Sequence, residues 1–112
     1  MNAGLIQVDI HDRNGVPIVA LEGELDLSNA HVLKKALATL DPAVSLAVVD
    51  LTNVTFIDST GLQAITTYGR GLIERDATLY IVATRPGVRK IFNITQIDRY
   101  FPVIQSLDEL PL

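Results

Sequence analysis

A run of apolar residues without alternation, Leu46-Ala47-Val48-Val49-Asp50-Leu51, constrains this chain more than any other feature. A strand with one solvated face alternates apolar and polar residues, whereas this run is apolar at five of its six positions. Such a pattern is typical of a strand that is covered on both faces, as in a parallel sheet. The run therefore predicts a central strand of a sheet that helices cover.

Two further strands precede this run. Ile6, Val8 and Ile10 alternate with polar residues, which indicates a half-buried strand. Asn14-Gly15 follows directly and is a strong hairpin signal. The returning strand begins at Pro17, where the missing N–H of proline does least harm. The first two strands are therefore predicted to form a hairpin.

Three segments with helical spacing are distributed among the strands. The first follows Ser28, a good N-cap residue, and ends at Asp41-Pro42 because proline disfavours the helical conformation of the residue before it. The second follows Asp58-Ser59. The third begins at Pro86, a residue that suits the first turn of a helix. Each segment is predicted to pack one apolar stripe against the sheet.

The remaining segments are short. Thr52 to Ile57 is predicted to be a connection, residues 78–83 a strand, and residues 100–104 a short last strand or an extended edge. Ser106 is expected to cap a final turn. The order ββαβαβα with a short tail predicts an α/β protein with a single domain over residues 1–112. Its mixed sheet should have about four to five strands and about four flanking helices.

Composition excludes several classes of function. The 112 residues carry 9 Lys+Arg against 13 Asp+Glu, a formal net charge of −4, and no cysteine. A chain without cysteine has no thiol nucleophile, disulfide or cysteine-ligated zinc. Its acidic balance lacks the basic stripe that nucleic acids require, and no apolar run approaches the roughly 20 residues that span a bilayer. Residues 1–4 contain no basic region that precedes an apolar run, so no secretory signal is expected there. We therefore expect a cytoplasmic protein that contacts neither nucleic acid nor membrane.

Ser59 is the most informative single residue, because it stands where a connection turns into a helix. One interpretation is structural: Asp58 or Ser59 caps the helix, and Gly61 permits close packing. A second interpretation is compatible with the first. A phosphate on an exposed hydroxyl at this point would meet free N–H groups and the positive end of the helix dipole. It would add about −1.5 to −2 charge, which Asp58 would repel, as would Asp26 or Glu24 if they lie nearby.

Enzymatic interpretations fit the residues less well. A serine nucleophile in a G-x-S-x-G elbow needs glycine at position 57, where the chain has Ile57. His11 falls on the outward face of the first strand and His31 in the first turns of a helix, so both are expected to be solvated. An aspartic-protease dyad uses Asp-Thr/Ser-Gly, whereas Thr60 here separates the serine from the glycine. No catalytic residue is therefore expected.

Metal and phosphate motifs are also weak. Glu24 and Asp26 form only a pair, which is more typical of a solvated acidic turn than of a metal site. Gly69-Arg70-Gly71 lies inside a helical pattern rather than after a strand, so it is not a phosphate loop. A solvated helix face accounts for the local basic cluster, Arg85, Arg89, Lys90 and Arg99. No metal ligand and no cofactor are expected.

Three blocks of sequence resemble a known family. They are Glu22–Asp26 before a capped helix, Val48–Leu51 followed by Val54–Leu62, and Val88–Phe92 followed by Ile97–Phe101. In this order and spacing they resemble the STAS domain, specifically the free-standing bacterial anti-sigma factor antagonists, from Leu5 to Leu110. The block Phe-Ile-Asp-Ser-Thr-Gly-Leu is the most specific part of the resemblance.

The resemblance implies a STAS-type fold and a switch by exchange of partners. An unmodified antagonist of this family binds a kinase-type anti-sigma factor and so frees a sigma factor. The anti-sigma factor, an ATP-dependent serine kinase, phosphorylates the serine of the Asp-Ser-Thr/Ser-Gly block and releases the antagonist, and a serine phosphatase resets it. Ser59 matches this phosphoacceptor. The residues that the resemblance implies for partner binding are Asp58, Thr60, Gly61 and Leu62, with Glu24 and Asp26 from the acidic block.

The chain departs from the common family pattern at two turns. Thr95-Gln96 stands where many members carry a glycine, and Arg75-Asp76-Ala77 stands where many have Gly-Gly. Both turns lie in connections away from Ser59. A STAS domain could also serve a signalling scaffold or act as the accessory subunit of a lipid or anion transport complex. The intact block with its acceptor serine favours the antagonist.

Overall fold

The computed structural model describes residues 5–112, so the expectation about a secretory signal, which rests on residues 1–4, lies outside the described residues. The strands are β1 (Ile6–Arg13), β2 (Val16–Leu25), β3 (Leu46–Ile57), β4 (Thr78–Val82) and β5 (Val103–Ile104). The helices are α1 (Ala30–Ala38), α2 (Ser59–Glu74) and α3 (Pro86–Ile94), with 3₁₀ turns at Ile97–Arg99 and Leu107–Glu109. The predicted α/β fold is confirmed. In its described part the chain forms three α-helices rather than about four, because the tail makes 3₁₀ turns instead.

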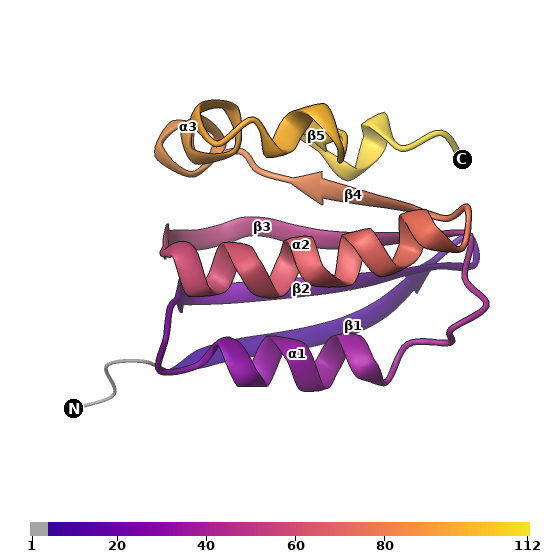
Figure 1. Cartoon of the computed structure of the whole chain (residues 1–112), viewed down its shortest axis with the longest axis horizontal. Coiled ribbons are helices and arrows are strands. Elements are labelled where there is room, and N and C mark those ends of the chain that lie inside the picture. The colour runs from indigo at the N-terminus through magenta and orange to yellow at the C-terminus, as the bar shows by residue number, and fades with distance from the viewer. Residues whose placement is uncertain (1–4) are drawn as a thin grey trace.

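The strands form one mixed sheet in the order β1-β2-β3-β4-β5. β1 and β2 are antiparallel around the predicted Asn14-Gly15 turn, and β2 to β5 run parallel. Helices α1 and α2 lie side by side over one face of the sheet (Figure 1). Val48 and Val49 on β3 point to opposite faces, and both are fully buried. The central strand is thus covered on both sides, as the apolar run predicted.

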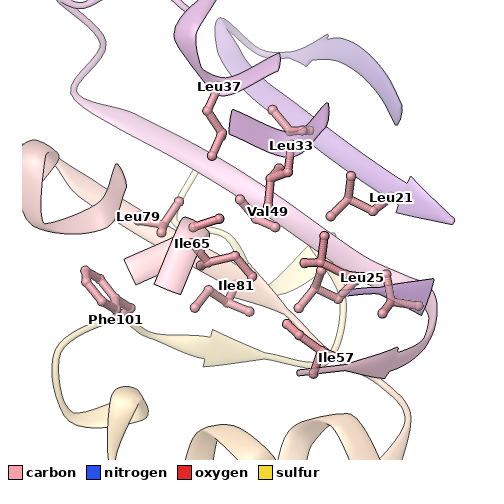
Figure 2. Packing of buried hydrophobic residues seen from close by; sticks show 14 of the residues in the cluster. Leu21, Leu25, Leu33, Leu37, Val49, Ile57, Ile65, Leu79, Ile81 and Phe101 are labelled. Atoms are coloured by element: carbon pink, nitrogen blue, oxygen red, sulfur yellow. The ribbon is translucent and has the colours of Figure 1, made fainter. Parts of the chain in front are cut away.

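Each face of the sheet has its own apolar core. The larger core lies between the sheet and the α-helices, and Figure 2 shows Leu33 from α1 and Ile65 from α2 close to Val49. On the other face, Leu110 from the C-terminal tail joins Val48 in a smaller core. The tail is held by a capping box in which Ser106 is the N-cap, as predicted. The site-bearing strand β3 is therefore fixed from both sides.

The segment from Thr52 to Ile57 was predicted wrongly as a connection, because it continues β3 as a strand. It pairs with the second half of β2, from the pair Glu22–Asn53 to the pair Leu25–Ile57. The pairing register shifts twice along this stretch, which breaks the regular alternation that marks a strand in sequence. The extension carries the end of β3 beyond its last pair with β4, Asp50–Val82. Ser59, which follows β3, therefore lies beyond the part of the sheet that β4 covers.

The prediction of Ser28 as an N-cap was also wrong. Helix α1 begins one residue later, with Asn29 at the N-cap position, and ends at Ala38. The Ser28 hydroxyl instead donates to Asp26 Oδ1 at 2.6 Å. Asn29 is buried, and its side chain ties the turn together: its amide donates to the Glu24 carbonyl at 2.7 Å, and its Oδ1 accepts from the Asp26 N–H at 2.9 Å. Ser28 is thus part of the turn that precedes α1, and the side chain of Asn29 stabilises this turn.

Both turns that depart from the family pattern have a left-handed residue. Gln96 has φ of +62° before the first 3₁₀ turn, and Asp76 has φ of +60° between α2 and β4. Glycine adopts this backbone conformation without a steric cost, whereas residues with a side chain rarely adopt it. The turns therefore keep the geometry that glycine favours, although neither position is a glycine.

Candidate functional site

The ends of β2 and β3 bring two separate blocks of the sequence together. The two strands are parallel, so their carboxyl ends meet at one edge of the sheet. Leu25, the last residue of β2, pairs with Ile57, the last residue of β3. The Asp58 N–H donates to the Leu25 carbonyl at 3.1 Å. Asp26 and Asp58, which follow the two strands, are therefore neighbours in the fold.

The carboxylate of Asp58 connects two elements. Its Oδ1 accepts the N–H of Gly61 at 2.9 Å, which makes Asp58 the N-cap of α2. Its Oδ2 accepts the N–H of Leu27 at 3.0 Å, across 31 positions of sequence. The prediction that Asp58 or Ser59 caps the helix is confirmed, with Asp58 in that role. The bond to Leu27 has no signal in the sequence, because it depends on the pairing of β2 and β3.

Ser59 is the exposed first residue of α2. Among the described residues, no hydrogen bond engages its hydroxyl. The first turn of α2 contains no acidic residue, and the carboxylate of its N-cap residue, Asp58, lies at the positive end of the helix dipole. The hydroxyl is thus accessible, at a helix end that accommodates negative charge.

Gly61 is buried behind the serine. A methyl group at this position would lie 2.7 Å from Leu25 Cγ and 3.1 Å from Ile57 Cγ1, and Figure 2 shows these two side chains side by side in the core. The expectation of close packing is confirmed. Thr60 and Leu62 on either side are half-buried and present part of their side chains to solvent.

The acidic turn after β2 is a folded structure. Asp26 Oδ1 accepts both the N–H of Ser28, at 2.9 Å, and its hydroxyl. Glu24 is exposed near the end of β2 and pairs with Phe56 on β3. The predicted residues from the two blocks therefore share one surface at the sheet edge. We call the surface formed by Glu24, Asp26, Leu27, Phe56 and residues 58–62 the switch surface.

Two exposed apolar side chains on the switch surface were not singled out from the sequence. Leu27 is 76% exposed and Phe56 is 49% exposed. Both break the usual pattern of apolar residues facing the core, and exposed apolar groups clustered beside polar ones are typical of a surface that another molecule covers. Phe56 could have been found from its place in the specific block, whereas Leu27 gives no such signal.

Neither histidine of the chain belongs to the switch surface. His11 is exposed on β1, where its Nδ1 lies 3.0 Å from Asp9 Oδ2, and His31 is exposed on α1. Within residues 5–112, no cluster of three or more His, Cys, Asp or Glu side chains could hold a metal ion. In the same range, no helix has both the length and the apolar character to cross a membrane. The surface offers an accessible hydroxyl, acidic groups and apolar contacts.

The family model of the STAS domain matches residues 7–110. The chain belongs to the STAS domain family. This STAS chain is 28% identical over 106 residues to the anti-sigma-F factor antagonist RsfB of Mycobacterium tuberculosis, which covers 93% of this chain and 85% of RsfB. It superposes on the crystal structure of an anti-sigma factor antagonist from Mycobacterium paratuberculosis with a TM-score of 0.86, at 29% identity, over 97% of this chain and 94% of the other.

The STAS fold is also that of SpoIIAA, which has been solved in two forms. The anti-sigma factor antagonist SpoIIAA in its unphosphorylated form gives a TM-score of 0.69, at 20% identity, over 94% of this chain and 92% of the other. The Bacillus cell fate determinant SpoIIAA in its phosphorylated form gives 0.67, at 19% identity, over 93% and 95%. The relatives of 28% and 29% identity are thus both named as anti-sigma factor antagonists.

Proposed function

We propose that this STAS protein is a cytoplasmic anti-sigma factor antagonist. In this proposal the switch surface binds a kinase-type anti-sigma factor, and phosphorylation of Ser59 ends the binding. The main support is the position of Ser59, which is exposed at the start of α2, where Asp58 fixes the first turn of the helix and the turn after β2. Relatives of 28% and 29% identity that are named antagonists favour this role over that of a scaffold or a transport subunit.

The unmodified surface suits a protein partner. Leu27 and Phe56 supply apolar area that binding would remove from water. Glu24 and Asp26 supply negative charge at its rim, which would orient a partner with basic groups. Because Asp26 and Asp58 are already held by hydrogen bonds, little ordering of the loops is needed when the partner arrives.

The proposed modification changes the charge at the centre of this surface. The anti-sigma factor transfers the γ-phosphoryl group of ATP to Ser59 Oγ, which yields ADP and a phosphoserine. The free protein accommodates the phosphate at the N-terminus of α2. In the complex, the same phosphate would be desolvated beside Asp58. A hundredfold weaker Kd requires only about 2.7 kcal/mol, so the switch needs no refolding. A serine phosphatase would restore the hydroxyl by hydrolysis.

The phosphoacceptor can be identified directly. Purified protein is incubated with Mg·ATP and each candidate kinase-type anti-sigma factor of the source bacterium, and the modified residue is located by mass spectrometry. We expect one phosphate, on Ser59, that is lost in Ser59→Ala and retained in Thr67→Ala, which removes an exposed hydroxyl of α2 outside the switch surface. Phosphate on another residue, or none with any candidate, would refute the proposal.

Binding measurements separate charge from shape at the same position. Ser59→Ala is expected to bind the anti-sigma factor as the unmodified protein does, because the exposed hydroxyl has no partner among the described residues. Ser59→Asp places a charge there and is expected to bind at least tenfold more weakly, a change of about 1.4 kcal/mol or more. Equal binding by both variants would show that charge on this residue is not the switch.

A further inference from the structure

A groove lies beside the second half of α2, away from the serine. It encloses about 590 Å³ and runs between α2 and the segment that links α3 to β5. Its principal lining residues are Thr66, Arg70 and Ile73 from α2, with Ile97, Tyr100 and Phe101 from the linking segment. We call it the α2 groove. Its volume is in the range of sites that take a ligand or an anchoring side chain.

The α2 groove has a packed floor and exposed apolar walls. Phe101 is buried and lies so close to α2 that a methyl group on Gly69 would be 2.5 Å from its ring. Above this floor, Ile73 is 46% exposed and Tyr100 is 72% exposed. Two large apolar side chains on the rim of one concave site lose contact with water only when something fills the site.

The α2 groove continues the switch surface along the same helix. At 100° per residue, Ser59, Leu62, Thr66 and Ile73 fall within about 60° of one another around the axis of α2, and they span about 21 Å along it. All four are exposed or half-buried. A standard interface covers about 800 Å² per partner, a patch on the order of 28 Å across. One partner can therefore cover both the serine and the groove.

The charges in the α2 groove favour a protein segment as its occupant. Arg70 and Glu74 both line it, and neither belongs to the ion pairs found among the described residues. A simple anion would meet Glu74 as well as Arg70, and an aliphatic chain would leave both without a partner. A peptide segment with an apolar side chain and flanking polar groups can complement both charges and the apolar walls.

We propose that the α2 groove is the second half of the anti-sigma factor interface, and that an amphipathic segment of that partner places an apolar side chain between Ile73 and Tyr100. This inference rests on the proposed function and extends its interface along α2. Ile73 lies 14 positions after Ser59 on α2, about 21 Å along the helix axis, so its contacts are independent of the phosphate. Phosphorylation then acts on the half of the interface that contains Ser59, and the loss of that half ends the binding although the groove itself is unchanged.

The test uses exposed apolar residues inside and outside the groove. Ile73→Ser and Tyr100→Ser remove the two walls, and Ile94→Ser is the matched control, because Ile94 is 65% exposed at the end of α3 and does not line the groove. Calorimetric titration with the anti-sigma factor that phosphorylates Ser59 gives Kd. We expect each wall variant to weaken binding by about 5- to 30-fold, as loss of an interface anchor does, and the control to bind like the unsubstituted protein. Thermal unfolding checks that all three variants fold.

The other outcomes separate the two proposals. If Ser59→Asp weakens binding while both wall variants bind normally, the groove inference fails and the proposed function stands. If Ile94→Ser loses as much affinity as the wall variants, the groove has no special role and the inference also fails. If the wall variants bind normally but a dimer seen by analytical ultracentrifugation is lost, the occupant is a second copy of this chain instead. If no anti-sigma factor binds at all, both proposals fail.

Discussion

Asp58 Oδ2 accepts the backbone N–H of Leu27 at 3.0 Å, while its other carboxylate oxygen accepts the N–H of Gly61 at 2.9 Å. The side chain of Asp58 thus joins the turn after β2 to the first turn of α2, which begins at Ser59. An aspartate beside the proposed phosphoacceptor would ordinarily be explained by its charge. Here the aspartate has a structural role as well, because both of its carboxylate oxygens accept hydrogen bonds that connect two parts of the switch surface.

Replacing Asp58 should test this geometric role. Asp58→Ala removes both bonds and is expected to lower the free energy of unfolding by about 2 kcal/mol, which urea titration measures. Asp58→Asn should cost less, because asparagine caps a helix as well as aspartate does. The single side-chain oxygen of asparagine can accept the N–H of Gly61. The N–H of Leu27 would then face the amide nitrogen, which cannot accept its hydrogen bond. Amide hydrogen exchange should therefore accelerate at Leu27 in both variants and at Gly61 only in Asp58→Ala. Unchanged protection at Leu27 in the alanine variant would contradict this role.

The glycines of α2 are expected to respond in opposite directions to alanine. At Gly61 the added methyl group would lie 2.7 Å from Leu25 Cγ, so Gly61→Ala should destabilise the fold by about 1–3 kcal/mol. At Gly71 the nearest atom is Arg75 Nη1 at 4.0 Å, so Gly71→Ala should stabilise it by about 0.5–1 kcal/mol through helix propensity. Urea unfolding of both variants measures the contrast. A neutral Gly61→Ala would show that Leu25 moves aside freely.

The acidic turn can be tested against a similar turn elsewhere in the chain. Asp26 accepts the N–H of Ser28 at 2.9 Å, and Asp41 accepts the N–H of Ala43 at 2.8 Å in the same local pattern. Asp26→Ala and Asp41→Ala should therefore lose similar stability. Only Asp26→Ala is expected to lose phosphorylation of Ser59 or binding of the anti-sigma factor, both measured with purified components. Full retention of both activities would remove Asp26 from the proposed interface.

The left-handed turns offer a stabilising change. Gln96 has φ of +62°, a conformation that costs a side-chain-bearing residue roughly 1–2 kcal/mol. Gln96→Gly should therefore raise the free energy of unfolding, by up to about 1 kcal/mol after the greater entropy of the unfolded glycine chain is included. Asp76→Gly, at φ of +60°, should gain less because aspartate tolerates this region better. Thermal unfolding compares the two, and a lower midpoint for Gln96→Gly would refute the assignment of strain.

The ion pair between the hairpin and the tail should make stability depend on pH at its acid end. The hydrogen bond from Arg13, at 2.7 Å, and then the charge of Arg13 hold the pKa of Asp108 below its ordinary value of 3.8. A lowered pKa in the folded state contributes stability above 3.8 that is lost as pH falls through the folded value. Arg13→Gln should therefore be slightly less stable than the unsubstituted protein at pH 7 and equally stable near pH 2. A difference that persists in acid would have another cause.

Features that depend on neighbouring residues could be predicted from the sequence, whereas features that depend on the pairing of strands could not. The Asn14-Gly15 turn and the Asp58 cap depend on residues close in sequence, and both predictions are confirmed. The close packing of Gly61 is confirmed as well, but the sequence did not identify Leu25 as its partner. The extension of β3 through Thr52 to Ile57 was missed, because its polar residues are stabilised by an irregular pairing with β2. Ser28 was misassigned as a cap, because the buried Asn29 takes the N-cap position and its side chain donates to the Glu24 carbonyl, five residues earlier.

The pairing of Leu25 with Ile57 also determines when the switch surface exists. The two residues belong to parallel strands separated by a whole helix, so their contact forms only after the crossover through α1 has closed. A nascent or misfolded chain carries Ser59 without the turn of Asp26 beside it. A partner that contacts both Ser59 and the turn of Asp26, as proposed here, would not bind such chains. Incomplete copies would then neither sequester the anti-sigma factor nor consume its ATP.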